Sequence, residues 1–139
     1  MICYYNNKYQ RITIIEIKDY DMLKAYNFLE LDENVLNPKK FQNYKGINAY
    51  IVKYCSDNKG SCKHDISFGK IININEKERE ITYQIDTGTG SLGSPILNLN
   101  TFKVFGMHQS SSKELNEKYG SLLHFAVKEF IGKFISNQK

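Results

Sequence analysis

Six short stretches of strand-forming residues constrain the fold of this chain more than any other feature of its sequence. Each stretch is rich in β-branched and aromatic residues, which favour strands over helices. They span residues 47–55, 66–74, 79–86, 95–99, 103–109 and 121–127. Turn-forming residues separate nearly all of them, and no pattern of strands alternating with helices is present. This spacing predicts an antiparallel barrel or sandwich.

The flanking segments predict one further strand, two helices and a linker. Residues 12–17, ITIIEI, have the length and β-branching of a strand. Apolar residues within 19–31 have a spacing that suits one or two helical turns. Residues 32–46 contain a proline with several Asn and Lys residues, which is typical of a linker. Residues 128–135 place their apolar side chains on one face of a short amphipathic helix.

Length and charge limit the possible classes of protein. The 139 residues suffice for one domain with its own core. The formal charge of +4 is spread along the chain and forms no basic stripe, so we expect no nucleic-acid partner. No window approaches the roughly 18 apolar residues of a membrane span, and the N-terminus lacks the features of a secretory signal. We therefore expect no membrane contact, and either a cytoplasmic protein or a fragment of a longer one.

The cysteines predict neither a metal site nor a structural disulfide. Cys3, Cys55 and Cys62 make an odd number, and no C-x-x-C pair is present. Cys55 and Cys62 flank the loop SDNKGS and can form a disulfide only in an oxidising compartment. His64 follows them, but two cysteines and one histidine have no fourth ligand nearby. We expect free thiols, no bound metal and no cofactor.

The segment between two of the expected strands, TGTGSLGSP at residues 87–95, is unusually rich in glycine. Glycine tolerates positive φ angles and lets a ligand approach the backbone closely. Successive N–H groups in such a loop can point at one place and bind an anion. A turn that only connects two strands has the same composition. The loop by itself leaves both interpretations open.

The wider region resembles the trypsin-like serine proteases. The run DTGTGSLGSPILN, followed by KVFGMHQSSS and NEKYGSLLHFAVKEFI, is similar to the C-terminal barrel of that family. The similarity is to the glutamyl-endopeptidase-like branch and related protist proteins. The positions that match the family pattern are Asp86, Thr87, Gly90, Gly93, Ser94, Pro95, Gly106, His108, Asn116 and Gly120.

This resemblance covers roughly residues 10–135 and implies an all-β fold. Residues 47–139 would form a six-stranded antiparallel Greek-key barrel with a short C-terminal helix. Residues 1–46 would be an orphan strand, the remnant of a first barrel, followed by a linker.

The resemblance also implies that the catalytic residues have been lost. In the family, the position before Gly93 holds the nucleophilic serine, and here it is Leu92, which has no proton to lose and no lone pair. Arg11 stands where the family has the triad acid, with the opposite charge. The triad histidine would come from a first barrel with no counterpart in this sequence. Neither Ser91 nor Ser94 has an evident base, so we expect neither to replace the nucleophile.

Two binding features would persist. The N–H groups of Gly90 and Leu92 would form a nest like an oxyanion hole, because any residue except proline supplies an N–H. Thr87 and His108 match positions that line a pocket for acidic side chains in the family. A hydroxyl and an imidazole can donate hydrogen bonds to a carboxylate, although both residues also suit purely structural roles. The expected ligand is an acidic or carboxylate-bearing peptide, bound more tightly as His108 is protonated near about pH 6.

Three functions remain open from the sequence. We favour an inactive protease-like domain that binds peptides or a partner, or a truncated fragment of such a protein. The first alternative is an active serine hydrolase whose first barrel is supplied elsewhere, and the second is an unrelated small β-domain. Without a first barrel, residues 12–17 can fold back onto the second barrel, pair with another copy or dock on a different chain. We expect self-association or docking, since an open strand edge is a template for pairing.

Overall fold

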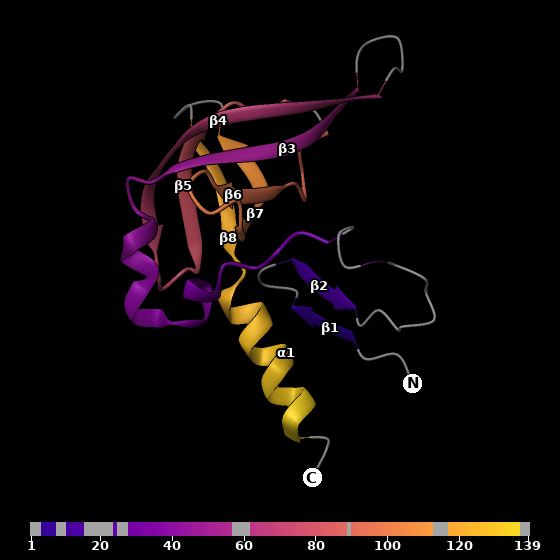
Figure 1. The fold of residues 1–139 in the computed structure, drawn as a ribbon, viewed down its shortest axis with the longest axis vertical. Coiled ribbons are helices and arrows are strands. Elements are labelled where there is room, and N and C mark those ends of the chain that lie inside the picture. Colours follow the sequence, from indigo (N-terminus) through magenta and orange to yellow (C-terminus); the bar gives the residue numbers. More distant parts are fainter. Residues whose placement is uncertain are drawn as a thin grey trace.

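The computed structural model contains a closed six-stranded antiparallel barrel, a C-terminal helix and a two-stranded hairpin outside the barrel (Figure 1). It describes residues 4–7, 11–15, 24, 28–56, 62–88, 90–112 and 117–136. The barrel strands are β3 (Asn48–Ser56), β4 (Cys62–Asn75), β5 (Glu80–Ile85), β6 (Pro95–Asn98), β7 (Val104–Ser112) and β8 (Glu117–Leu122). Their order is β3-β4-β5-β8-β7-β6, and β6 pairs with β3 to close the barrel. The predicted barrel is confirmed, and the N-terminal strand lies outside it as expected.

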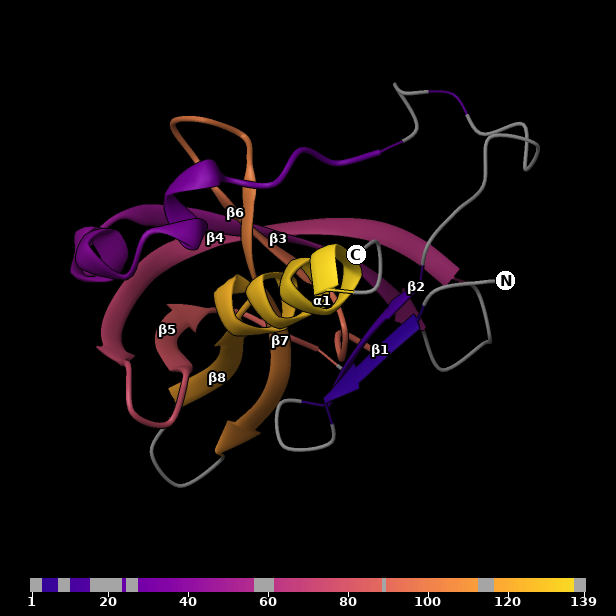
Figure 2. The same cartoon turned by 90° about the horizontal axis from the view of Figure 1, so that it is seen from below.

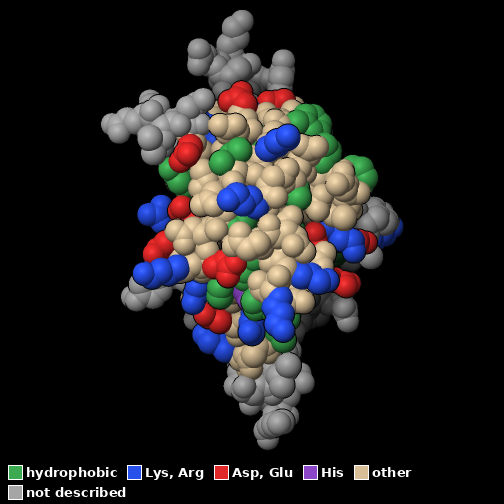
Figure 3. All heavy atoms as spheres, turned by 90° about the vertical axis from the view of Figure 1, so that its left-hand side faces the viewer, with side chains coloured by type: hydrophobic (Ala, Val, Ile, Leu, Met, Phe, Trp, Pro, Cys, Tyr) green, Lys and Arg blue, Asp and Glu red, His purple; other side chains and the backbone are tan. Residues whose placement is uncertain are grey.

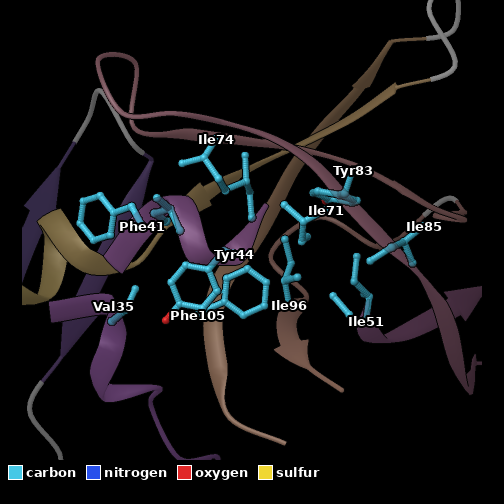
Figure 4. Packing of buried hydrophobic residues seen from close by; sticks show 13 residues of the cluster. Val35, Phe41, Tyr44, Ile51, Ile71, Ile74, Tyr83, Ile85, Ile96 and Phe105 are labelled. Atoms are coloured by element: carbon cyan, nitrogen blue, oxygen red, sulfur yellow. The ribbon is translucent and has the colours of Figure 1, made fainter. Parts of the chain in front are cut away.

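Side chains that alternate along each strand between the inside and the outside of the barrel form its core. In β5, Ile81, Tyr83 and Ile85 are buried, whereas Thr82 is half-buried and Gln84 is exposed. Alternation of this kind is what a barrel strand requires, because one face looks inward and the other meets solvent. Figure 4 shows Tyr83 and Ile85 among the buried side chains of the core. The core cluster consists of Val35, Phe41, Tyr44, Ala49, Ile51, Ile71, Ile74, Ile81, Tyr83, Ile85, Ile96, Phe105 and Leu122.

The segment predicted as a linker contributes to this core. It forms two short 3-10 helices, η3 (Glu33–Leu36) and η4 (Pro38–Tyr44). Tyr44 is buried and stacks on Phe105 of β7 with 4.6 Å between ring centroids. The apolar residues of this polar segment thus close one end of the barrel. The Asn and Lys residues around them made the segment look like a linker in the sequence. The domain boundary at residue 46 stays a prediction.

The C-terminal helix starts earlier than the sequence predicts. The last strand, expected at 121–127, is β8 and ends at Leu122, and α1 (His124–Ser136) begins where strand was expected. The imidazole Nδ1 of His124 hydrogen-bonds the carbonyl of Val35, which ties the start of α1 to η3. These tertiary contacts override the strand propensity of SLLHFAV. No helix in the described ranges is both long and apolar enough to span a bilayer.

The N-terminal hairpin folds back against the helix. β1 (Tyr4–Asn7) pairs with β2 (Ile12–Ile15) in antiparallel register. Ile12 is buried against Ala126 of α1, and Met107 of β7 packs against the same cluster. Figure 2 shows the hairpin lying beside α1. β1 thus supplies one pairing partner for β2, while self-association or docking through residues 12–17 stays a prediction. The helix expected over 19–31 lies mostly outside the described residues.

Both signs of charge occur together on the surface. On the face shown in Figure 3, Lys and Arg side chains lie among Asp and Glu side chains. The ion pair between Arg79 and Glu129, with 3.6 Å between Nη1 and Oε1, is one such contact between the barrel and α1. Exposed pairs of this kind contribute about 0.2–1 kcal/mol each.

Mild acid should destabilise the fold through His124. Burial lowers the pKa of His124 below its ordinary value, so the unfolded chain binds a proton more readily than the folded one. Stability is therefore present above about pH 6.5 and is lost as the pH falls below it. His124→Asn keeps a side-chain donor for the Val35 carbonyl but does not titrate. We expect its melting temperature to fall less between pH 7.5 and 5.5 than that of the wild type, measured by circular dichroism.

The exposed His64 provides the matched control. His64→Asn should show the wild-type loss of melting temperature on acidification. An equal loss in His124→Asn and in the wild type would show that His124 does not carry the effect.

Candidate functional site

The glycine-rich loop between β5 and β6 lies across one end of the barrel and is fixed at both ends. At its start, the buried Lys53 of β3 donates from Nζ to the carbonyl of Asp86 at 3.2 Å. At its end, Gly93 donates to the carbonyl of His108 and the His108 amide donates to the carbonyl of Ser94, both at 2.9 Å. These contacts attach the described residues at both ends of the loop to the barrel.

Within the loop, N–H groups alternate between paired and unpaired. Ser91 donates to the carbonyl of Gly88 at 3.3 Å, and Gly93 is bonded to β7. Among the described residues, the amides of Gly90 and Leu92 have no acceptor. Gly90 has a φ of +90° and Gly93 a φ of +82°, values that favour glycine. The two amides predicted to form an anion-binding nest are therefore the two left without a protein partner.

The side chain at the tip of the loop is exposed and apolar. Leu92 is 71% exposed and does not join the core, which leaves its position open to solvent. Ser91 points the other way: it is 1% exposed, and its hydroxyl donates to the carbonyl of Gly88 at 2.7 Å. Ser94 is also buried. The two serines next to Leu92 thus lie within the loop and not at its surface.

His108 is a buried histidine beside the loop. Its Nδ1 hydrogen-bonds the hydroxyl of Tyr83, and that hydroxyl also lies 3.3 Å from the carbonyl of Tyr119. Gly120 stands opposite His108 in the register, and a Cβ there would lie 2.6 Å from the carbonyl oxygen of Met107. A larger residue would therefore force the backbone of β7 to shift.

The protonation of His108 expected near about pH 6 does not agree with the buried position of its ring. Burial lowers the pKa of His108, and nearby Lys118 lowers it further, against a raising effect of a hydrogen bond to the Tyr119 backbone. The imidazole therefore stays neutral at a pH where an ordinary histidine is already partly charged. Any hydrogen bond that His108 makes to a ligand near neutral pH comes from a neutral ring.

A recess of about 390 Å³ opens beside the loop. Gln84, Ile85, Asp86 and Lys118 border it. Thr87 follows Asp86 directly, and its buried hydroxyl has no hydrogen-bond partner among the described residues. Of the four residues that border the recess, the sequence interpretation missed Gln84, Ile85 and Lys118.

The remaining candidate residues lie apart from the loop or are bonded elsewhere. His64 on β4 is exposed, with Nε2 at 3.0 Å from the hydroxyl of Tyr54, and His124 is bonded to η3. Arg11 is exposed at the turn before β2 with a φ of +53°. In the strand register, Cys55 is opposite Lys63 and Cys62 opposite Ser56, while the side chains of both cysteines lie outside the described set.

Alanine substitutions at the two loop glycines should separate backbone strain from steric contact. A Cβ at Gly93 meets nothing within 4 Å, whereas one at Gly90 would lie 2.9 Å from the Tyr54 carbonyl. Gly93→Ala should cost about 1–2 kcal/mol, the cost of a left-handed conformation. Gly90→Ala should cost more, because the backbone of β3 must also move. Urea denaturation measures both, and a larger loss for Gly93→Ala would contradict the described loop.

Comparison with known proteins identifies the fold. No family model matches the sequence, and no curated protein matches it. Catalytically active tobacco etch virus protease complexed with product aligns with a TM-score of 0.56 at 15% identity, over 87% of this chain and 48% of that one. Tobacco vein mottling virus protease gives 0.52 and 16%, over 79% and 46%. Catalytically inactive tobacco etch virus protease complexed with substrate gives 0.55 and 15%, over 87% and 51%.

This chain thus spans about half the length of these viral proteases. At such low identity the likeness concerns the fold alone. The domain has, at this coarse level, the trypsin-like protease fold.

Proposed function

We propose that this domain binds peptides on a protease scaffold without cleaving them. The observation that carries the proposal is Leu92, an exposed apolar side chain at the tip of a loop in which the amides of Gly90 and Leu92 have no acceptor among the described residues. A leucine cannot attack a carbonyl, but its N–H can still donate a hydrogen bond. Catalysis depends on a side chain here, whereas binding depends on the backbone.

Each of the three histidines already has a hydrogen-bond partner within the domain. His108 is engaged by Tyr83, His124 by Val35 and His64 by Tyr54. A general base must come within hydrogen-bond reach of the hydroxyl it activates. Ser91, the nearest hydroxyl in sequence, is buried and donates to Gly88. These contacts support a domain without hydrolytic activity.

An extended peptide has an edge to pair with beside the loop. β6 pairs with β7 only as far as Met107, whereas β7 continues to Ser112. From Ser110 to Ser112, β7 has β8 as its only strand partner in the described part of the chain. A strand edge of this kind can accept a peptide by main-chain hydrogen bonding. The recess and the loop amides lie at the same end of the barrel.

Proteins with this fold hold ligands with and without catalysis. One tobacco etch virus protease is described as active and complexed with product, and another as inactive and complexed with substrate. Loss of activity in the neighbouring fold is therefore compatible with ligand binding.

The recess favours a carboxylate side chain, as in the glutamyl-endopeptidase branch that the sequence resembles. Lys118 supplies a positive charge at its border, and Asp86 supplies a negative charge at the same border. Burial raises the pKa of Tyr83, so its hydroxyl keeps its proton. That hydroxyl donates to the carbonyl of Tyr119 at 3.3 Å and also contacts Nδ1 of His108.

Catalytic silence can be tested directly. Peptide and ester substrates, including ones with Glu before the scissile bond, should show no turnover, and a fluorophosphonate probe should not label the protein. Leu92→Ser should also remain inactive, because it adds a hydroxyl without a base and triad members act as a unit. Stoichiometric labelling of Ser91 or Ser94, or clear amidase activity in Leu92→Ser, would overturn the proposal.

The charge at the recess can be tested with one pair of variants. Lys118→Met should weaken binding of a peptide ending in Glu by about two- to fivefold, the effect of losing one partly exposed ion pair. The same peptide ending in Gln should be affected less. Lys77→Met, at an exposed site in the turn between β4 and β5, should change neither. Fluorescence anisotropy measures both affinities, and equal losses for Glu and Gln would exclude Lys118 as the carboxylate partner.

A further inference from the structure

We propose that the outer face of β3 and β4 is the surface through which two copies of this chain associate. Three features of this surface support the proposal: the exposure of its apolar side chains, the backbone conformation of Phe102 and the lack of charge. The proposal does not depend on peptide binding. We call this surface the apolar face, and it consists of Tyr50, Val52, Tyr54, Ile66, Phe68 and Phe102.

The pairing of β3 with β4 brings these side chains together. Tyr50 is opposite Phe68, and their ring centroids are 6.0 Å apart. Val52 is opposite Ile66 in the same register. Successive residues of a strand alternate between its two faces. Because Ile51, between Tyr50 and Val52, is fully buried in the core, its two neighbours lie on the outer face.

The two strands continue beyond the rest of the barrel. β6 pairs with β3 only at residues 49–51, and β5 pairs with β4 from Gly69 onward. Beyond these points the ribbon of β3 and β4 has no third strand in the described part of the chain, and Figure 1 shows it extending away from the other strands. A two-stranded ribbon is marginally stable alone. Contact with a second molecule along its outer face would therefore stabilise it.

The exposed apolar area is of the size found at the centre of a dimer interface. Tyr54 is 56% exposed, Ile66 50%, Phe68 61% and Phe102 65%. Since a large aromatic side chain has a surface of about 150–250 Å², these four expose on the order of 400 Å². The largest apolar patch on a typical monomer measures about 300–600 Å² and is often functional. A standard interface covers about 800 Å² of each partner, with an apolar centre and a polar rim.

Phe102 has a backbone conformation that is unfavourable for a bulky residue. It lies in the turn between β6 and β7 with a φ of +58°, a value that Gly or Asn adopts more easily. Its amide donates to the carbonyl of Asn98 at 2.8 Å, and its ring centroid lies 6.4 Å from that of Tyr50. The ring nevertheless stays mostly exposed, so the monomer gains little from the strained turn. Strain that presents an exposed apolar ring indicates a contact outside the monomer.

The chemistry of the apolar face favours a second copy over a nucleic acid or a sugar. The ring of Tyr50 is inclined by 34° to that of Phe68 and by 64° to that of Phe102, so the three rings offer no common plane for stacked bases or sugars. None of the six residues carries a charge for a phosphate or a charged protein to pair with. An uncharged surface can face its own copy without repulsion. A twofold axis brings the same residues of both copies together, and packed sheets lie about 10 Å apart.

The glycine-rich loop lies on the other side of β3. Lys53 is buried and donates from Nζ to the carbonyl of Asp86, at the start of that loop. Lys53 stands between Val52 and Tyr54 in the strand, so its side chain points away from the apolar face. A dimer formed through the apolar face therefore does not require the loop.

Sedimentation velocity on the full chain tests the proposal. We expect a dimer whose fraction increases with protein concentration in the micromolar range. Phe68→Asp places a charge within the apolar face and should raise the dimer dissociation constant at least about tenfold. Ile15→Asp is the matched control, because Ile15 of β2 is 60% exposed but lies outside this face. It should leave the dissociation constant unchanged.

Two results of this experiment would overturn the proposal. A wild-type chain that stays monomeric at every concentration would leave the apolar face to a different protein. Dissociation by Ile15→Asp but not by Phe68→Asp would assign the association to residues 12–17 instead.

Phe102→Asn separates a role in association from a role in folding. Asn tolerates the positive φ better than Phe, so this variant relieves the strain while it removes the ring. We expect a dissociation constant about tenfold higher than that of the wild type. The melting temperature of the dilute monomer, measured by circular dichroism, should be no lower. A lower melting temperature with an unchanged dissociation constant would contradict the proposal, and this variant decides the matter if Phe68→Asp does not fold.

Discussion

The order of strands in the closed barrel determines the shape of the candidate site. β5 and β6 follow one another in sequence but are not neighbours, because β8 and β7 lie between them. The segment that joins β5 to β6 therefore cannot be a tight hairpin turn and has to cross the end of the barrel. On its way it meets β7, to which Gly93 and Ser94 are bonded, and the recess bordered by Lys118 of β8. The glycines and the unpaired amides follow from this crossing.

In the loop that makes this crossing, the backbone and the side chains have separate roles. Gly90 and Gly93 have positive φ angles, and the amides of Gly90 and Leu92 have no acceptor in the part of the chain that the structure describes. This arrangement does not depend on the residue at position 92, provided that it is not proline. A protease scaffold can consequently lose its nucleophile in one substitution and keep a place for an anion. The proposed function requires that anion binding by the backbone does not depend on the side chain at position 92.

Much of the fold could be predicted from the sequence, and the errors have physical causes. The strand pattern and the DTGTGSLGSPILN motif indicated the barrel and its loop. The core residues of η3 and η4 were missed because Phe41 and Tyr44 are isolated in a polar segment, where no periodicity reveals them. The start of α1 was missed because His124 is fixed by Val35, far away in sequence. Tertiary contacts of this kind have no local signal.

The site was predicted unevenly for similar reasons. Gly93 and Ser94 of the predicted loop are bonded to His108, but the protonation of His108 depends on burial that composition does not reveal. Lys118 was missed because its relation to His108 passes through the pairing of β7 with β8. Motifs that lie within one stretch of sequence could be recognised, whereas contacts that arise when two strands pair could not be predicted.

The most direct test of the account is a titration of ¹⁵N-labelled protein with a peptide that ends in a free carboxylate, followed by the backbone amide resonances of the loop. The account predicts large downfield proton shifts for Gly90 and Leu92, the unpaired donors, and much smaller ones for Ser91 and Gly93, whose hydrogens are already bonded. Shifts of equal size at all four amides, or shifts confined to residues away from the loop, would contradict it.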